Sequence, residues 1–137
     1  MNRVVIAEDE RLLVEMLTEL FAEEGFVVTA FGTADEAWRH LKAQQLPPDL
    51  LFTDVKMPGR MDGLELADAF SALWPAIPVV ISSGHVHSAE HPHSQTSFLA
   101  KPWSFDALSK VCETFEPALA SVSLGWRLWV ENAHLAQ

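Results

Sequence analysis

Five short apolar segments recur along the chain, and each is bounded by polar residues, glycine or proline. Continuous apolar runs of this length are typical of strands that are buried on both faces of a parallel sheet. We therefore predict strands over residues 4–7, 26–31, 50–53, 78–82 and 97–100.

Longer segments with apolar residues three and four positions apart follow the strands, and this spacing indicates amphipathic helices. We expect helices over residues 12–21, 34–41, 64–70 and 105–115. Gly25 is the expected C-cap of the first helix. Thr33 and Glu36 have the spacing of a capping box that opens the second.

The alternation of strands and helices predicts right-handed crossovers and one parallel sheet covered on both faces. A chain of 137 residues suits a single core. We expect one domain over residues 1–120 and a tail over residues 121–137, too short for a helix-turn-helix output domain.

Composition narrows the range of partners and compartments. The net charge of −10 argues against binding nucleic acid, because an acidic chain repels phosphates. No apolar run approaches the roughly 20 residues that span a bilayer, and the N-terminus does not resemble a signal peptide. The single cysteine, Cys112, excludes an internal disulfide and fits a reducing cytoplasm, where it reads as a small buried hydrophobe.

Polar residues follow directly after four of the five predicted strands. They are Glu8, Asp9, Glu10, Asp54, Ser83 and Lys101. In such sheets the carboxyl ends of the strands share one edge, where ligands bind. Clustered acids repel one another unless a cation or a proton intervenes, and Mg²⁺ with its preference for oxygen ligands would resolve the conflict. The ammonium of Lys101 and the hydroxyl of Ser83 suit a phosphoryl group.

Each of these residues alone has an ordinary structural explanation. A lone aspartate or serine after a strand more often caps a helix or is simply solvated, and Glu8 or Asp9 would fit that role. The combination favours a site, because all the polar groups fall at one edge and each follows an apolar strand.

The ordered set of motifs resembles the response-regulator receiver family, including its chemotaxis-type single-domain members. The resemblance covers residues 3–119 and rests on Glu8-Asp9-Glu10, on the run 53–59, on Ser83-Gly84 and on Lys101-Pro102. It implies a flavodoxin-like, doubly wound, five-stranded parallel sheet.

The resemblance also implies a role for each matching residue. Asp54 is the implied phosphoacceptor; Asp9, Asp54 and the backbone carbonyl of Lys56 are the implied Mg²⁺ ligands; Ser83 and Lys101 are the implied phosphoryl contacts; Phe98 is the implied switch aromatic. The implied partners are a sensor histidine kinase or histidine phosphotransfer protein as phosphodonor and a downstream protein target, with no nucleic acid and no membrane. Such a protein assists its own phosphorylation and dephosphorylation and is not otherwise an enzyme.

The sequence departs from the family pattern at two places near the site. Glu8 stands where the family more often has aspartate, and we expect its longer arm to reach the metal shell, either directly or through a water molecule. The loop after Asp54 is one residue longer than usual, because Arg60 and Met61 both precede Asp62. We expect Arg60 to be a solvated loop residue.

The segment between Ser83 and Lys101 is shorter than usual, which predicts a shortened or irregular fourth helix and a nonstandard partner surface. It holds His85, His87, His91 and His93, so a Zn²⁺ or Cu²⁺ site and a pH-responsive loop are both open, with the loop favoured. His85 and Lys56 also lie two residues beyond Ser83 and Asp54, where the family tunes the lifetime of the phosphoryl group.

Three further alternatives stay open. Trp126 and Trp129 in the tail either pack on the domain's own surface, which we favour, or form a homodimer or partner contact. A phosphotransfer enzyme with an aspartyl-phosphate would usually have an acid at position 56, where this chain has lysine. A pseudo-receiver that binds partners without phosphorylation is disfavoured by the intact set of site residues.

Overall fold

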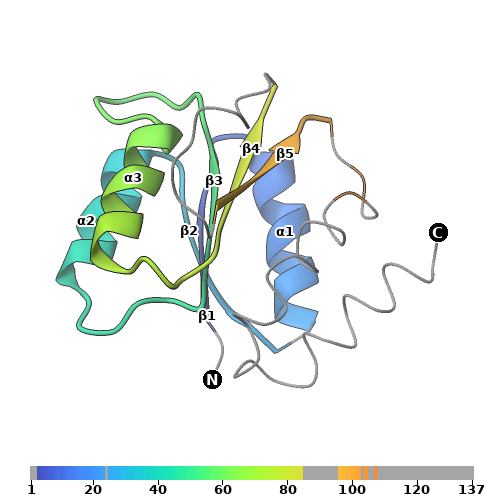
Figure 1. The fold of residues 1–137 in the computed structure, drawn as a ribbon. Helices are drawn as coiled ribbons and strands as arrows, with labels where there is room; N and C mark the ends of the chain where they lie inside the picture. Colours follow the sequence, from blue (N-terminus) through green and yellow to red (C-terminus); the bar gives the residue numbers. More distant parts are fainter. Residues whose placement is uncertain (1–2, 24, 85–95, 103, 105–106, 108–137) are drawn as a thin grey trace.

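The computed structural model describes residues 3–23, 25–84, 96–102, 104 and 107. Five parallel strands form one sheet in the order β2-β1-β3-β4-β5 (Figure 1). Their bounds are β1 Arg3–Ala7, β2 Val27–Phe31, β3 Leu50–Asp54, β4 Val79–Ser83 and β5 Thr96–Ala100. Each bound lies within one residue of the strand expected from the sequence.

Three helices connect the first four strands: α1 Arg11–Glu23, α2 Ala34–Ala43 and α3 Gly63–Leu73. Helix α1 covers one face of the sheet, and α2 and α3 lie side by side on the other (Figure 1). The chain runs outward from β1 to β2 and then returns to β3 on the opposite side of β1. This reversal is the point at which doubly wound sheets bind their ligands.

The two faces of the sheet carry separate apolar clusters. Ile6 and Phe52 pack with Leu17 and Phe21 of α1 on one face. On the other face, the alternate strand residues pack against α2 and α3; they include Val5, Ala7, Leu51, Val79 and Ile81. Strands β3 and β4 are buried along their whole length, which explains why the sequence shows continuous apolar runs there.

Local signals at the helix ends are confirmed in part. Gly25 follows α1 with φ +87°, a left-handed conformation that suits glycine at a C-cap. The Thr33 side chain accepts a hydrogen bond from the Glu36 N–H, but the Glu36 carboxylate accepts from the Thr33 hydroxyl (3.2 Å). A full reciprocal capping box lies instead at the start of α3, between Asp62 and Glu65, where the sequence had indicated only a loop.

Several expectations fall on residues outside the described ones. They are the irregular fourth helix, the four histidines at 85–93, Cys112, the last helix at 105–115 and the tail. Among the described helices, none is long and apolar enough to cross a membrane.

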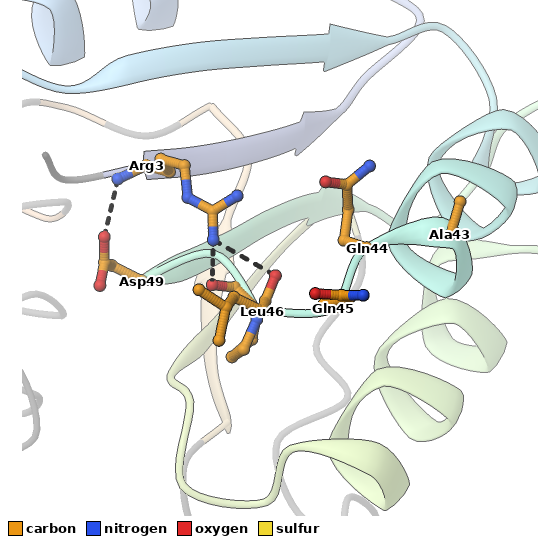
Figure 2. Close-up of a pocket in the computed structure, with 7 residues that line it drawn as sticks. Arg3, Ala43, Gln44, Gln45, Leu46 and Asp49 are labelled. Atoms are coloured by element: carbon orange, nitrogen blue, oxygen red, sulfur yellow. Dashed lines mark hydrogen bonds between the residues drawn. The ribbon is translucent and has the colours of Figure 1, made fainter.

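A pocket opens at the edge of the sheet where the strands begin, between the start of β1 and the α2–β3 connection (Figure 2). The Arg3 guanidinium donates hydrogen bonds to the carbonyls of Leu46 (3.2 Å) and Pro47 (2.6 Å). The Arg3 backbone N–H donates to Asp49 Oδ2 (2.7 Å). These groups hold the α2–β3 connection against β1. They therefore have a structural role at the end of the sheet opposite Glu8 and Asp54.

Candidate functional site

Glu8 directly follows β1 and is buried, with its side chain fully excluded from solvent. Its backbone N–H donates to the Phe31 carbonyl of β2 (3.0 Å). This bond continues the pairing of β1 with β2 by one residue and fixes the backbone from which the Glu8 side chain enters the site. One carboxylate oxygen, Oε2, accepts from the Glu10 N–H (2.9 Å). Asp9, by contrast, is exposed at the mouth of the site.

Asp54 ends β3, the central strand at the reversal of the sheet. One of its carboxylate oxygens, Oδ1, accepts a hydrogen bond from the Val55 N–H (2.8 Å). This hydrogen bond holds the carboxylate in one orientation. Asp54 is also buried, with only 7 % of its surface exposed. A buried aspartate at this place is costly unless charged neighbours compensate it.

Lys101 supplies that compensation from the end of β5. Its Nζ lies 3.1 Å from Glu8 Oε1 and 3.2 Å from Asp54 Oδ2, and 3.8 Å from Glu10 Oε2. Its backbone N–H donates to the Ser83 carbonyl of β4 (2.7 Å), so the main chain is tied to the neighbouring strand just before the lysine enters the site. One ammonium therefore neutralises acids from two other strand ends.

The electrostatics of this cluster favour a second cation. Burial raises the pKa of Glu8 above its ordinary value; the charge of Asp54 adds to this rise, while the Glu10 N–H and Lys101 oppose it. For Lys101, burial acts to lower the pKa, but the carboxylates of Glu8 and Asp54 outweigh it and the pKa is raised. Three acids, Glu8, Glu10 and Asp54, lie within 3.8 Å of this one ammonium, so the described residues leave an excess of negative charge.

Glu8, Asp9 and Asp54 can each offer a carboxylate oxygen, with the three atoms within 4.8 Å of one another. Glu8 Oε1 is buried and, although it faces Lys101 Nζ, accepts no well-directed hydrogen bond from the described residues. An oxygen-only ligand set suits a hard divalent cation. Direct contact of Glu8 with the metal and contact through water both stay predictions.

Ser83 and Phe98 lie on the two last strands. Ser83 is buried at the end of β4, one step beyond the residue that pairs with Asp54 across the sheet. Phe98 is half-buried beside Ile81 and packs against the apolar cluster on the α2–α3 face. Ser83 therefore lies at the edge where the strands end, whereas Phe98 lies in the middle of β5, two residues before its end.

The loop after Asp54 is closed at its base and tied at its tip. The Gly63 N–H donates to the Val55 carbonyl (2.8 Å), and a Cβ at Gly63 would overlap the Asp54 carbonyl. Lys56 lies in this loop with its side chain exposed, and Arg60 is exposed as expected.

Two residues near the site were not assigned a role from the sequence. Glu10 contributes a third acid near Lys101, although it had been noted within the acidic run. Asp35, in the first turn of α2, accepts hydrogen bonds from the backbone N–H groups of Arg60 (2.9 Å) and Met61 (3.3 Å). Apart from the unusual length of the loop, no sequence signal indicated this contact, because Asp35 and its two partners are far apart in sequence.

Comparisons with known proteins identify the family. Residues 4–113 match the family model of the response regulator receiver domain. The chain is 32% identical over 107 residues to the response regulator receiver protein CpdR of Brucella abortus, covering 75% of this chain and 87% of that protein. It is 30% identical over 115 residues to the nitrogen assimilation regulatory protein NtrX of Azorhizobium caulinodans, covering 80% of this chain but only 25% of that protein.

The fold is also found among solved structures. A response regulator receiver domain protein from Methanospirillum hungatei superposes with a TM-score of 0.74 at 21% identity, covering 88% of this chain and 98% of that one. Several curated relatives, NtrX among them, are about four times longer than the part that this chain matches. The chain belongs to the response-regulator receiver domain family of two-component systems.

Proposed function

We propose that Asp54 is the phosphoacceptor of this receiver domain and that Mg²⁺ completes its site. The carrying observation is the placement of Lys101 Nζ 3.2 Å from Asp54 Oδ2, within a group of carboxylates that exceeds its charge. A carboxylate in this setting is both a nucleophile and part of a cation site.

The residues that would hold the metal are Asp9, Asp54 and the backbone carbonyl of Lys56, with Glu8 as a direct ligand or through water. Bound there, the metal would offset negative charge on the transferring phosphoryl group. Glu8 and Asp9 contribute the negative charge that attracts the cation to the mouth of the site.

The chain's own groups orient the nucleophile and stabilise the transferring phosphoryl group. The Val55 N–H holds one Asp54 oxygen, which orients the carboxylate for in-line attack on phosphorus. An Asp54 oxygen forms the new P–O bond while the P–N bond of a phosphohistidine breaks and its electron pair returns to the imidazole. Lys101 stabilises charge on the phosphoryl oxygens, and Ser83 donates a hydrogen bond to one of them.

The new acyl phosphate adds about 1.5 to 2 negative charges to a crowded site. The Lys101 ammonium then pairs with the phosphoryl oxygens rather than with the three carboxylates around it. Ser83 ends β4 at this site, and Phe98 lies on β5, the strand that leads to Lys101, so the two residues are suited to pass the change to the surface.

The phosphodonor in this proposal is a sensor histidine kinase or a histidine phosphotransfer protein, and the output is contact with a downstream protein in the cytoplasm. The receiver assists the gain and loss of its own phosphoryl group.

The test is incubation with Mg²⁺ and acetyl phosphate followed by intact-mass measurement. The wild type should gain one phosphoryl group, while Asp54→Asn should gain none. Omission of Mg²⁺ should abolish the gain in the wild type. If a folded wild type binds Mg²⁺ yet gains no mass, the phosphoacceptor proposal is wrong and a binding module without phosphorylation replaces it.

A further inference from the structure

The loop that follows Asp54 makes a contact that the proposed phosphoryl site does not itself require. Asp35 Oδ2 accepts two backbone hydrogen bonds from consecutive residues, Arg60 (2.9 Å) and Met61 (3.3 Å). Asp35 lies in the first turn of α2, on a different element from the loop. The contact therefore joins the N-terminus of α2 to the tip of the β3–α3 loop.

The loop conformation is fitted to this carboxylate. Gly59 adopts φ +113°, which L side chains rarely adopt, and a Cβ at this position would overlap the Asp35 carboxylate. The left-handed turn at Gly59 thus brings the next two N–H groups toward one acceptor. Hydrogen bonds to a carboxylate are stronger than those to a neutral acceptor, so this tie is well suited to hold an exposed loop.

The remainder of the loop is anchored on both sides of this tie. Met57 and Met61 pack against the apolar cluster on the α2–α3 face. The Gly63 N–H closes the base on the Val55 carbonyl at 2.8 Å. Lys56, whose backbone carbonyl is the proposed metal ligand, therefore lies between a closed base and a tied tip.

We infer that Asp35 is a positioning residue, which holds the extended loop so that the Lys56 carbonyl is preorganised to bind Mg²⁺. This inference rests on the proposed function of the site. Without the tie, the loop must be ordered at the moment when the cation binds, and that loss of conformational freedom weakens affinity. The effect acts on the backbone ligand, because Asp9 lies beyond the end of β1 and Asp54 ends β3, both outside the tied part of the loop.

The chain offers a matched control in the next residue. Glu36 lies in the same first turn of α2 and carries the same charge, but its carboxylate accepts from the Thr33 hydroxyl rather than from the loop. Replacing either acid removes one negative charge near the helix N-terminus, so the two variants share any effect of the helix dipole. Only Asp35→Ala releases the loop.

The experiment measures Mg²⁺ affinity by calorimetry without phosphodonor, on the wild type, Asp35→Ala, Asp35→Asn and Glu36→Ala. We expect Asp35→Ala to weaken Mg²⁺ binding on the order of tenfold, as for residues that support metal ligands. Glu36→Ala should stay within about twofold, and Asp35→Asn, which keeps an acceptor oxygen, should recover much of the affinity. Amide exchange at Arg60 and Met61 should speed up in Asp35→Ala alone.

Phosphorylation by acetyl phosphate gives a second reading. In Asp35→Ala the Mg²⁺ concentration for half-maximal rate should rise by the same factor, while the rate at saturating Mg²⁺ changes little. Equal Mg²⁺ affinity in Asp35→Ala and the wild type, or equal losses in Asp35→Ala and Glu36→Ala, would overturn the inference and leave the phosphoacceptor proposal standing. A folded wild type that neither binds Mg²⁺ nor gains a phosphoryl group would overturn both.

Discussion

Glu8 is placed where its own surroundings oppose its charge. Burial and the nearby Asp54 raise its pKa from the ordinary value of 4.5, so the folded chain holds the Glu8 proton more tightly than the unfolded chain does. A carboxyl whose pKa is raised by folding contributes most to the free energy of unfolding below its ordinary pKa. This contribution is lost as pH rises through the raised pKa. The site thus stores unfavourable charge that a cation would relieve.

This linkage gives a test of the Glu8 environment without any phosphodonor. In Mg²⁺-free buffer, the free energy of unfolding of the wild type should fall relative to that of Glu8→Gln as pH rises from 4.5 through the raised pKa. Urea unfolding across about pH 5 to about pH 8 measures both proteins. Parallel stability curves for the two proteins would show that Glu8 has an ordinary pKa after all.

Lys101 is the counterpart of Glu8 and allows a complementary prediction. Lys101→Met keeps most of the length of the side chain but leaves the buried carboxylates of Glu8 and Asp54 without their ammonium partner. We expect the Mg²⁺-free variant to lose about 2 kcal/mol of unfolding free energy, the size of a hydrogen bond to a charged group. Millimolar Mg²⁺ should restore part of this loss, and urea unfolding with and without the cation would reveal it.

At the scale of elements, the junction between β3 and α3 sets the geometry of the site. Gly63 begins α3 directly against the Asp54 carbonyl, and its N–H closes the loop on Val55. A side chain at this position would push α3 away from the strand that carries Asp54. The close approach therefore couples the packing of a helix to the orientation of a carboxylate.

Gly63→Ala should consequently destabilise the fold by about 1–3 kcal/mol, as overpacking does in a close-packed interior. Gly32→Ala is the matched control, because a Cβ there meets nothing within 4 Å, and it should stay within about 0.5 kcal/mol. Thermal or urea unfolding of the two variants compares them directly. Equal stability in both would mean that α3 can shift without cost.

The junctions also mark where sequence reasoning succeeds and where it stops. Strands and the acids at their ends were predictable, because burial on both faces leaves an apolar run and the run ends where Glu8 or Asp54 enters the site. The contact of Asp35 with Arg60 was not, since it depends on a left-handed turn at Gly59 and on two elements meeting in space. The capping box at Asp62 was hidden within a glycine- and proline-rich segment that resembles a loop.

At the scale of the whole molecule, the site sits at the edge shared by two apolar layers. The α1 face and the α2–α3 face have separate clusters, yet both include residues from β1 and β3. Strand β1, which directly precedes Glu8, and strand β3, which ends at Asp54, are therefore packed on both faces. A ligand bound at this edge contacts groups whose positions depend on the entire sheet, so its binding energy should stabilise the fold as a unit.

Mg²⁺ should accordingly raise the stability of the whole domain by mass action. At a concentration 100 times its dissociation constant, a ligand that binds only the folded state adds about 2.7 kcal/mol to the unfolding free energy. We expect a gain of this size in the wild type and a much smaller one in Asp9→Asn and Asp54→Asn, which remove a proposed ligand charge. NaCl at matched ionic strength controls for screening of the net charge of −10. If NaCl stabilises the wild type as much as MgCl₂ does, the acids at this edge are screened rather than bridged by a bound cation.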